Sequence, residues 1–238
     1  DNMASGISSF GGRNTVGLSM STLSMFSSPM RDIFFDYLKN PEFNEKIIER
    51  EKYIQAEQIK KRDDNPAQIA ILKFNEQMFN DHPYAKDPVG NSDYLKSIDH
   101  KQIKEFYSRF LTPENLNFTL VGAVDAKEWV DYLEKQTGDI KKTQFLPKEY
   151  AFNPPAENKK IFTKVDKNQS HIVIGYPGLT FKHKDRYILT VVQSILSGQG
   201  GRLFLELRDK ESLAYSVSPI KMEGVDAGYF GGYIGCSP

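Results

Sequence analysis

The segment RLFLELRDKESLAYSV, residues 202–217, carries the strongest local pattern of the chain. It is typical of a helix that passes through a short turn into a strand. Arg208 lies near the expected end of the helix, and Tyr215 lies in the expected strand. Taken alone, an arginine at a helix C-terminus is usually a solvated charge, and a strand tyrosine usually serves packing.

The segments around this run predict a mixture of helices and strands. After residue 158 we expect helices at 184–197 and 201–210 and strands at 160–165, 171–176, 214–220 and 227–236. Before residue 139 we expect strands near 15–21 and at 116–124. The helices expected there cover 29–38, 44–62, 66–80, 99–111 and 126–137, with Asn65 as a cap and Pro66 opening the third. This order lacks a regular strand-helix-strand period and predicts an α+β fold.

A Lys-rich and Pro-rich stretch, 139–158, has no apolar period and is the expected domain linker. The predicted domains are therefore 1–145 and 146–238. The second is expected to be incomplete at its C-terminal end, because the chain stops directly after an expected strand. We accordingly expect a fragment of a longer protein.

Composition excludes several classes of function. Lys plus Arg is 31 and Asp plus Glu is 31, so no net charge attracts nucleic acid or anionic lipid. No apolar run approaches the roughly 20 residues of a membrane span. The single cysteine, Cys236, excludes an internal disulfide and a multi-cysteine metal site. Cytoplasmic and periplasmic locations both stay open.

Motifs for metal or nucleophilic chemistry are missing. The four histidines, His82, His100, His171 and His183, form no i, i+4 pair, and the sequence contains no H-x-x-E-H. His82, in the sequence His-Pro-Tyr, is expected in a turn. No G-x-S-x-G is present, and Cys236 has no flanking histidine. The glycine-rich loop 197–202 lacks the Lys-Ser/Thr of a phosphate-binding loop, which favours a turn between helices.

Gln58 is the polar residue of interest in the expected helix 44–62. At about 100° per residue, Ile47, Ile54 and Gln58 fall within roughly 20° of one line. Gln58 is therefore expected to point inward with the apolar side chains. A core amide, hydrogen-bonded to backbone, is the alternative to a functional role.

Five segments of the chain occur in a recognisable order: Gly12–Leu18, Asn40–Phe43, Asp81–Gly90, Leu120–Asp125 and Arg202–Val217. Together these segments resemble the pitrilysin, insulysin and mitochondrial processing peptidase family of inverted zinc-binding metallopeptidases. The resemblance covers nearly the whole chain and is to the inactive second half of a long bacterial member. It implies two homologous α+β domains, each a largely antiparallel sheet packed against helices, both truncated.

The resemblance also implies where the chemistry is missing. Active members carry H-x-x-E-H and a further glutamate on the helix matched by 44–62, and that glutamate corresponds to Gln58. An amide is a poor zinc ligand, and Glu57 cannot replace it because a one-residue slip turns the helix by about 100°. The resemblance therefore implies no catalytic residue and no metal ligand here. The chain alone is expected to be inactive, with zinc in the active half.

Arg208 and Tyr215 match the family's arginine and tyrosine, which hold the substrate carbonyl and the tetrahedral intermediate from the inactive half. The resemblance thus implies a peptide-binding chamber shared with an active zinc-binding half, on the same polypeptide or a separate subunit. The implied partners are that half and a peptide substrate. Two alternatives stay open: a structural scaffold resembling core subunits of respiratory complexes, and a module that binds peptides by adding them to a sheet edge.

Overall fold

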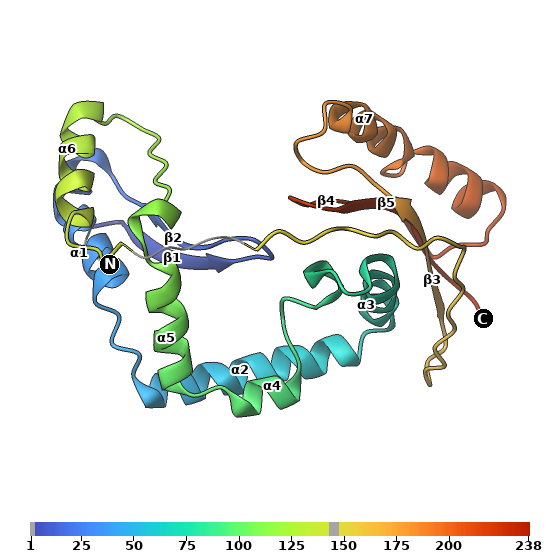
Figure 1. Ribbon diagram of the computed structural model, residues 1–238. Coiled ribbons are helices and arrows are strands. Elements are labelled where there is room, and N and C mark those ends of the chain that lie inside the picture. The colour runs from blue at the N-terminus through green and yellow to red at the C-terminus, as the bar shows by residue number, and fades with distance from the viewer. Residues whose placement is uncertain (1–2, 143–147) are drawn as a thin grey trace. The chain divides into compact units, whose positions relative to one another are not determined.

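The computed structural model describes residues 3–142 and 148–238, which form two compact units (Figure 1). The first unit comprises 3–53 and 93–142, and the second comprises 54–92 and 148–238. Helix α2, Glu45–Asp63, contributes to both. The stretch 54–92 thus packs with the C-terminal part of the chain. The predicted division at 145/146 falls outside the described residues, and the homology of the two predicted domains stays a prediction.

The first unit combines one β-hairpin with helices. Strands β1, Gly6–Gly11, and β2, Val16–Ser21, pair antiparallel, with Gly6 opposite Ser21. The strand expected near 15–21 is thereby confirmed. The remaining elements are the short helix η1 (Ser24–Phe26), α1 (Ser27–Lys39), α4 (Ser92–Ser97, which begins at the unit boundary), α5 (His100–Phe110), η3 (Pro113–Asn115) and α6 (Ala126–Thr137).

Helices α1 and α6 form the core of this unit through aromatic contacts. The Phe35 ring centroid lies 5.4 Å from that of Tyr132, and Arg31 Cζ lies 4.2 Å from the same Tyr132 ring. Arg31 also pairs with Glu128 at 2.6 Å. Burial and the hydrogen bond to Asp32 raise the pKa of Tyr132 to about 12. The apolar contacts and the ion pair together join residues about a hundred positions apart in the sequence.

The second unit contains a three-stranded antiparallel sheet in the order β3-β5-β4. Its strands are β3, Ser170–Pro177, β4, Ser216–Glu223, and β5, Gly228–Cys236. Helix α3, Pro66–Phe79, covers one face, and η2, Pro83–Ala85, follows it. The core comprises Met78, Phe79, Tyr84, Ala227 and Tyr229.

The start of α3 follows its sequence signals. The Asn65 side chain accepts hydrogen bonds from the N–H groups of Ala67 and Gln68, and Pro66 opens the helix. Glycine allows α3 to approach the sheet, because a Cβ at Gly175 would lie 2.5 Å from the Phe74 ring. The predicted cap is therefore confirmed, and the helix that it starts covers the sheet.

Helix α7, Arg186–Leu196, lies on the other face of the sheet (Figure 1). Two polar contacts join it to β4: Thr190 Oγ1 accepts from Lys221 Nζ at 2.8 Å, and Arg186 Nε lies 3.4 Å from Glu223. At about 100° per residue, Val191 lies roughly 140° away from Arg186 around the helix. The side of α7 that faces away from β4 is exposed within the chain and carries the apolar residues Tyr187, Ile188, Val191, Val192 and Ile195.

The observed elements confirm an α+β fold with antiparallel sheets and correct two predicted strands. Residues 116–124 and 160–165 form no strand. Their β-branched and aromatic residues find no sheet to pack on: Val121 is 94% exposed and Phe162 is 92% exposed. A strand needs a hydrogen-bonded neighbour, and neither segment has one among the described residues.

Candidate functional site

Arg208 lies in an unusual helical segment, η4, Phe204–Lys210, which is π-helical. The Leu205 N–H still donates to the Gly201 carbonyl, four residues back, whereas the Glu211 N–H donates to the Glu206 carbonyl, five residues back. The predicted helix at 201–210 is thus present but widened. Such segments are rare and occur frequently at functional sites.

The Arg208 guanidinium is exposed and lies over an aromatic ring, with Cζ 4.8 Å from the centroid of Phe204. Among residues 3–142 and 148–238, no carboxylate is paired with Arg208. The nearby Glu206 is engaged by Lys210 at 2.7 Å. The N–H donors of Arg208 are therefore available to a ligand in the geometry that suits carboxylates and carbonyl oxygens.

A strained turn carries the chain from η4 to β4. Ser212 has φ +53°, a left-handed conformation that non-glycine residues seldom adopt. The turn is held by the Leu213 N–H, which donates to the Leu207 carbonyl at 2.9 Å. Backbone strain of this kind costs on the order of 1–3 kcal/mol and tends to collect at functional sites.

Tyr215 follows the turn and immediately precedes β4. Its N–H donates to the Gly235 carbonyl at 2.8 Å, which fixes its backbone beside β5. The side chain is 59% exposed, and its hydroxyl lies 3.0 Å from that of Ser237. Both residues singled out from the sequence therefore lie on the surface, on either side of the turn in one helix-turn-strand segment. Their functional role stays a prediction.

The inward orientation expected for Gln58 is wrong. Gln58 is exposed, as are Ile47 and Ile54 on the same line, whereas the next residue, Ile59, is 2% exposed. The buried line of α2 runs through Ile59, which is turned about 100° from Gln58. The line through Ile47, Ile54 and Gln58 is therefore present on α2, but no described residue covers it. Gln58 is thus not the core amide considered as an alternative.

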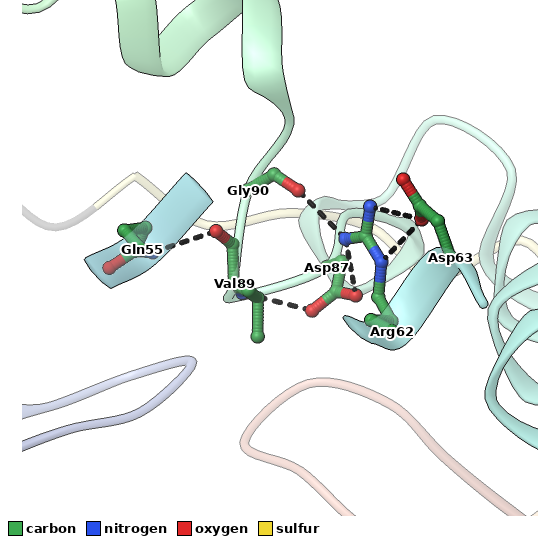
Figure 2. Close-up of polar contacts among 6 residues, drawn as sticks. All are labelled: Gln55, Arg62, Asp63, Asp87, Val89 and Gly90. Atoms are coloured by element: carbon green, nitrogen blue, oxygen red, sulfur yellow. Dashed lines mark hydrogen bonds and ion pairs between the residues drawn. The ribbon is translucent and has the colours of Figure 1, made fainter. Parts of the chain in front are cut away.

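A polar clamp between α2 and the turn 87–90 was not predicted from the sequence (Figure 2). Arg62, at the end of α2, donates to Asp87 Oδ2 at 2.9 Å and to the Gly90 carbonyl at 2.8 Å. Gln55 donates to the Val89 carbonyl at 2.8 Å. Burial alone would lower the pKa of Arg62, but its hydrogen bonds to Asp63 and Asp87 outweigh burial and raise it. The turn 87–90 is therefore tied to α2.

His82 joins two turns within the second unit. It caps η2, as expected of a turn residue, because its Nδ1 accepts from the Tyr84 N–H at 3.2 Å. It is also 5% exposed, and Nε2, which has no hydrogen-bond partner among the described residues, lies 3.9 Å from Asp226. Burial lowers the pKa of His82, and the Asp226 charge only partly offsets that effect. Tyr84 reinforces the link by accepting from the Val225 N–H at 2.9 Å.

The described residues do not fit a zinc site. They contain no group of three or more His, Cys, Asp or Glu side chains arranged to hold a metal ion. The position expected for a glutamate ligand carries the amide of Gln58. Among the same residues, no helix has both the length and the apolar character needed to cross a bilayer.

The sequence of this chain is similar to one protein family and to proteins named as zinc proteases. Residues 97–238 match the family described as "Peptidase M16 inactive domain". An uncharacterized zinc protease of Rickettsia bellii (strain RML369-C) is 27% identical over 203 residues, covering 83% of this chain and 48% of the relative. The uncharacterized zinc protease YmxG of Bacillus subtilis (strain 168) is 25% identical over 207 residues, with the same shares.

Solved structures share the fold at low sequence identity. The peptidase M16 inactive domain from Pseudomonas fluorescens has a TM-score of 0.89 at 20% identity, covering 99% of this chain and 58% of that one. A protease from Helicobacter pylori has a TM-score of 0.88 at 22% identity, covering 100% and 58%. A chain of Complex III2 from Candida albicans has a TM-score of 0.74 at 13% identity, covering 99% and 58%.

The matched region includes the helix-turn-strand segment with Arg208 and Tyr215. The chain spans about half the length of the curated relatives that it matches, which are named zinc proteases. The α+β fold, the antiparallel sheets and the family match agree with one another. The chain belongs to the peptidase M16 family and contains its inactive domain.

Proposed function

We propose that this chain is the non-catalytic half of a zinc metalloendopeptidase and forms part of the wall of its peptide-binding chamber. The membership in the M16 family, with a match to the inactive domain, supports a partner half that holds zinc. The names of the relatives, which are zinc proteases, support the same assignment. In this proposal the zinc and the general base belong to the active half.

The observation that carries the proposal is a pair of exposed side chains with hydrogen-bond donors on one surface segment. Arg208 is exposed without a carboxylate partner in the described part of the chain, and the phenol of Tyr215 is 59% exposed. A guanidinium and a phenol O–H can both donate to the oxygen of a peptide carbonyl. Donors preset at the position of a developing oxyanion stabilise it without reorganisation during the reaction.

A cleavage assay tests this proposal. A quenched fluorescent peptide library is incubated with zinc and with this chain, the active half, or both. We expect cleavage by the mixture and none by this chain alone. Replacing Arg208 by alanine and Tyr215 by phenylalanine together should lower turnover by about one to three decades, as loss of oxyanion donors does.

Matched controls separate this role from general surface effects. Lys210→Ala removes an exposed cation from the same segment, and Tyr187→Phe removes the hydroxyl of a tyrosine that is 69% exposed on α7. Both should leave turnover within about twofold of wild type, because surface changes away from special features are small. Cleavage by this chain alone would overturn its assignment as the non-catalytic half. Unchanged turnover in the Arg208 and Tyr215 variant would overturn their role.

A second candidate, a module that binds extended peptides, is favoured by the position of β4. This strand is at the edge of the sheet formed by the described residues, and it begins directly after Tyr215. An edge strand offers unpaired N–H and C=O groups to an added strand. Micromolar binding of a library peptide to this chain without the active half, with unchanged affinity in the Arg208 and Tyr215 variant, would favour this candidate.

A further inference from the structure

The two donors of the proposed site are each held by one neighbouring side chain. Arg208 rests against the ring of Phe204, and the Tyr215 hydroxyl lies beside that of Ser237. These contacts come from different parts of the second unit: Phe204 is in η4, and Ser237 directly follows β5. Each donor therefore has its own support.

The contact with Phe204 holds the Arg208 cation while sparing its hydrogen-bond donors. The Cζ atom lies 4.8 Å from the ring centroid, within the range of a cation–π interaction. An aromatic face attracts the charge but accepts none of the conventional hydrogen bonds that a carboxylate would take. The N–H groups at the edge of the guanidinium consequently stay available to a substrate oxygen.

The contact with Ser237 orients the Tyr215 phenol. The two oxygens are 3.0 Å apart, and either hydroxyl can donate. A Tyr215 that donates its O–H to a substrate must accept from Ser237, and such chains of hydrogen bonds strengthen one another. The backbone supports the same arrangement, because the Tyr215 N–H donates to Gly235, two residues before Ser237. The end of β5 thus holds both the main chain and the ring of Tyr215.

We infer that Phe204 and Ser237 are positioning residues for Arg208 and Tyr215, which gives the chain a site organised before substrate binds. This inference rests on the proposed function. Enzyme donors act best when their orientation is fixed in advance by a supporting layer of side chains. Removing either support should leave the donors present but poorly oriented, and should therefore lower turnover without abolishing it.

The test compares disruptive and conservative replacements. Phe204→Leu removes the aromatic face but keeps an apolar side chain, and Phe204→Tyr retains the face. Ser237→Ala removes the hydroxyl, and Ser237→Thr retains it. Each disruptive variant should lower kcat/KM of the mixture with the active half by about two- to fivefold, the size expected of one exposed contact. The conservative variants should recover wild-type values.

Spectroscopy on this chain without the active half provides a readout that does not depend on cleavage. The NMR signal of the Arg208 Nε–H should lose its ring-current shift in Phe204→Leu and keep it in Phe204→Tyr. The fluorine signal of 3-fluorotyrosine incorporated at Tyr215 should move in Ser237→Ala and stay in Ser237→Thr. Circular dichroism melts identify any variant that fails to fold. At such a position the conservative variant, Phe204→Tyr or Ser237→Thr, still decides the outcome.

The outcomes separate the inference from the proposed function. Signals that do not move show that the two contacts do not hold the donors, and the inference falls. Signals that move without any loss of turnover also overturn it, while Arg208→Ala and Tyr215→Phe can still lower turnover and leave the proposed function intact. If neither donor matters for turnover, the proposed function fails and the inference fails with it.

Discussion

Replacing Arg62 by alanine should release the turn Asp87–Gly90 from helix α2. Arg62 donates to Asp87 at 2.9 Å and to the Gly90 carbonyl at 2.8 Å, and the Arg62 and Asp87 side chains are only 12% and 19% exposed. A hydrogen bond to a charged group contributes about 1.5–3 kcal/mol, whereas the exposed partner Asp63 adds little. We expect a loss of about 2–3 kcal/mol in the local stability of the turn.

Native-state hydrogen exchange measures this loss where it occurs. The Val89 N–H donates to Asp87 Oδ1 and the Gly90 N–H donates to the Asp87 carbonyl, each at 2.9 Å. Both amides should exchange about one and a half to two decades faster in the Arg62 variant, since 1.4 kcal/mol is a factor of ten. The fluorescence of Trp129, the single tryptophan, reports the first unit and should not change.

Arg50→Ala is the matched control because Arg50 lies on the same helix. It pairs with Glu51, and these side chains are 68% and 56% exposed, so its removal should cost less than about 1 kcal/mol. If the Val89 and Gly90 amides exchange at the same rate in the Arg62 and Arg50 variants, the clamp does not hold the turn. The loss of local stability that we expect from the burial and charge of Arg62 and Asp87 would then be refuted.

Three further predictions concern pH, packing and association. Because burial lowers the pKa of His82 in the folded chain, the unfolded chain binds more protons. Stability should therefore be full above pH 6.5 and fall as the pH decreases below it. In urea melts at pH 5 and pH 7, the His82→Asn variant should show a smaller loss of stability at the lower pH than wild type. Gly231→Ala should destabilise the second unit by about 1–3 kcal/mol, since its Cβ would lie 2.1 Å from the Ile174 carbonyl oxygen. Gly232→Ala is the control, because the nearest atom to its Cβ would be 3.9 Å away, and it should cost little stability in the same melts. Val191 is 59% exposed on the apolar side of α7, and we expect that surface to favour self-association of this chain. Val191→Lys should reduce this association in light scattering without lowering the melting temperature. Unchanged association would contradict the prediction.

Local signals in the sequence predicted the features that depend on neighbouring residues. Asn65 and Pro66 predicted the start of α3, and the Asn65 side chain caps that helix as expected. The apolar spacing of 29–38 predicted α1, which the structure extends to Ser27–Lys39. These elements form from interactions within a few residues, so their positions can be read directly from the sequence.

Features that depend on distant partners could not be predicted in this way. The segment 116–124 has the composition of a strand, but its pairing depends on a neighbour that the local sequence does not specify. The helical period predicted that Ile47, Ile54 and Gln58 share one line, but not whether anything covers it. The contact of Arg62 with Asp87 joins residues 25 positions apart. The Asp-Pro-x-Gly sequence at 87–90 indicates a turn there, but it does not indicate which residue binds that turn.

The candidate site was predicted in part. The resemblance singled out Arg208 and Tyr215, and both side chains are exposed. The π-helical form of η4 and the left-handed Ser212 were not predicted, because neither has a strong local signature in the sequence. Phe204 and Ser237 were also missed, since their relevance depends on contacts rather than on sequence spacing.

Site-specific photocrosslinking tests the central claim most directly. A photoreactive phenylalanine replaces Tyr215, or Tyr187 as a control that is similarly exposed on α7, and the chain is mixed with the active half and a labelled library peptide. Substrate contact at the proposed site predicts crosslinking to the peptide from position 215 that excess unlabelled peptide suppresses, with none from position 187. Equal crosslinking from both positions, or none from 215 while the mixture still cleaves the peptide, would contradict the account.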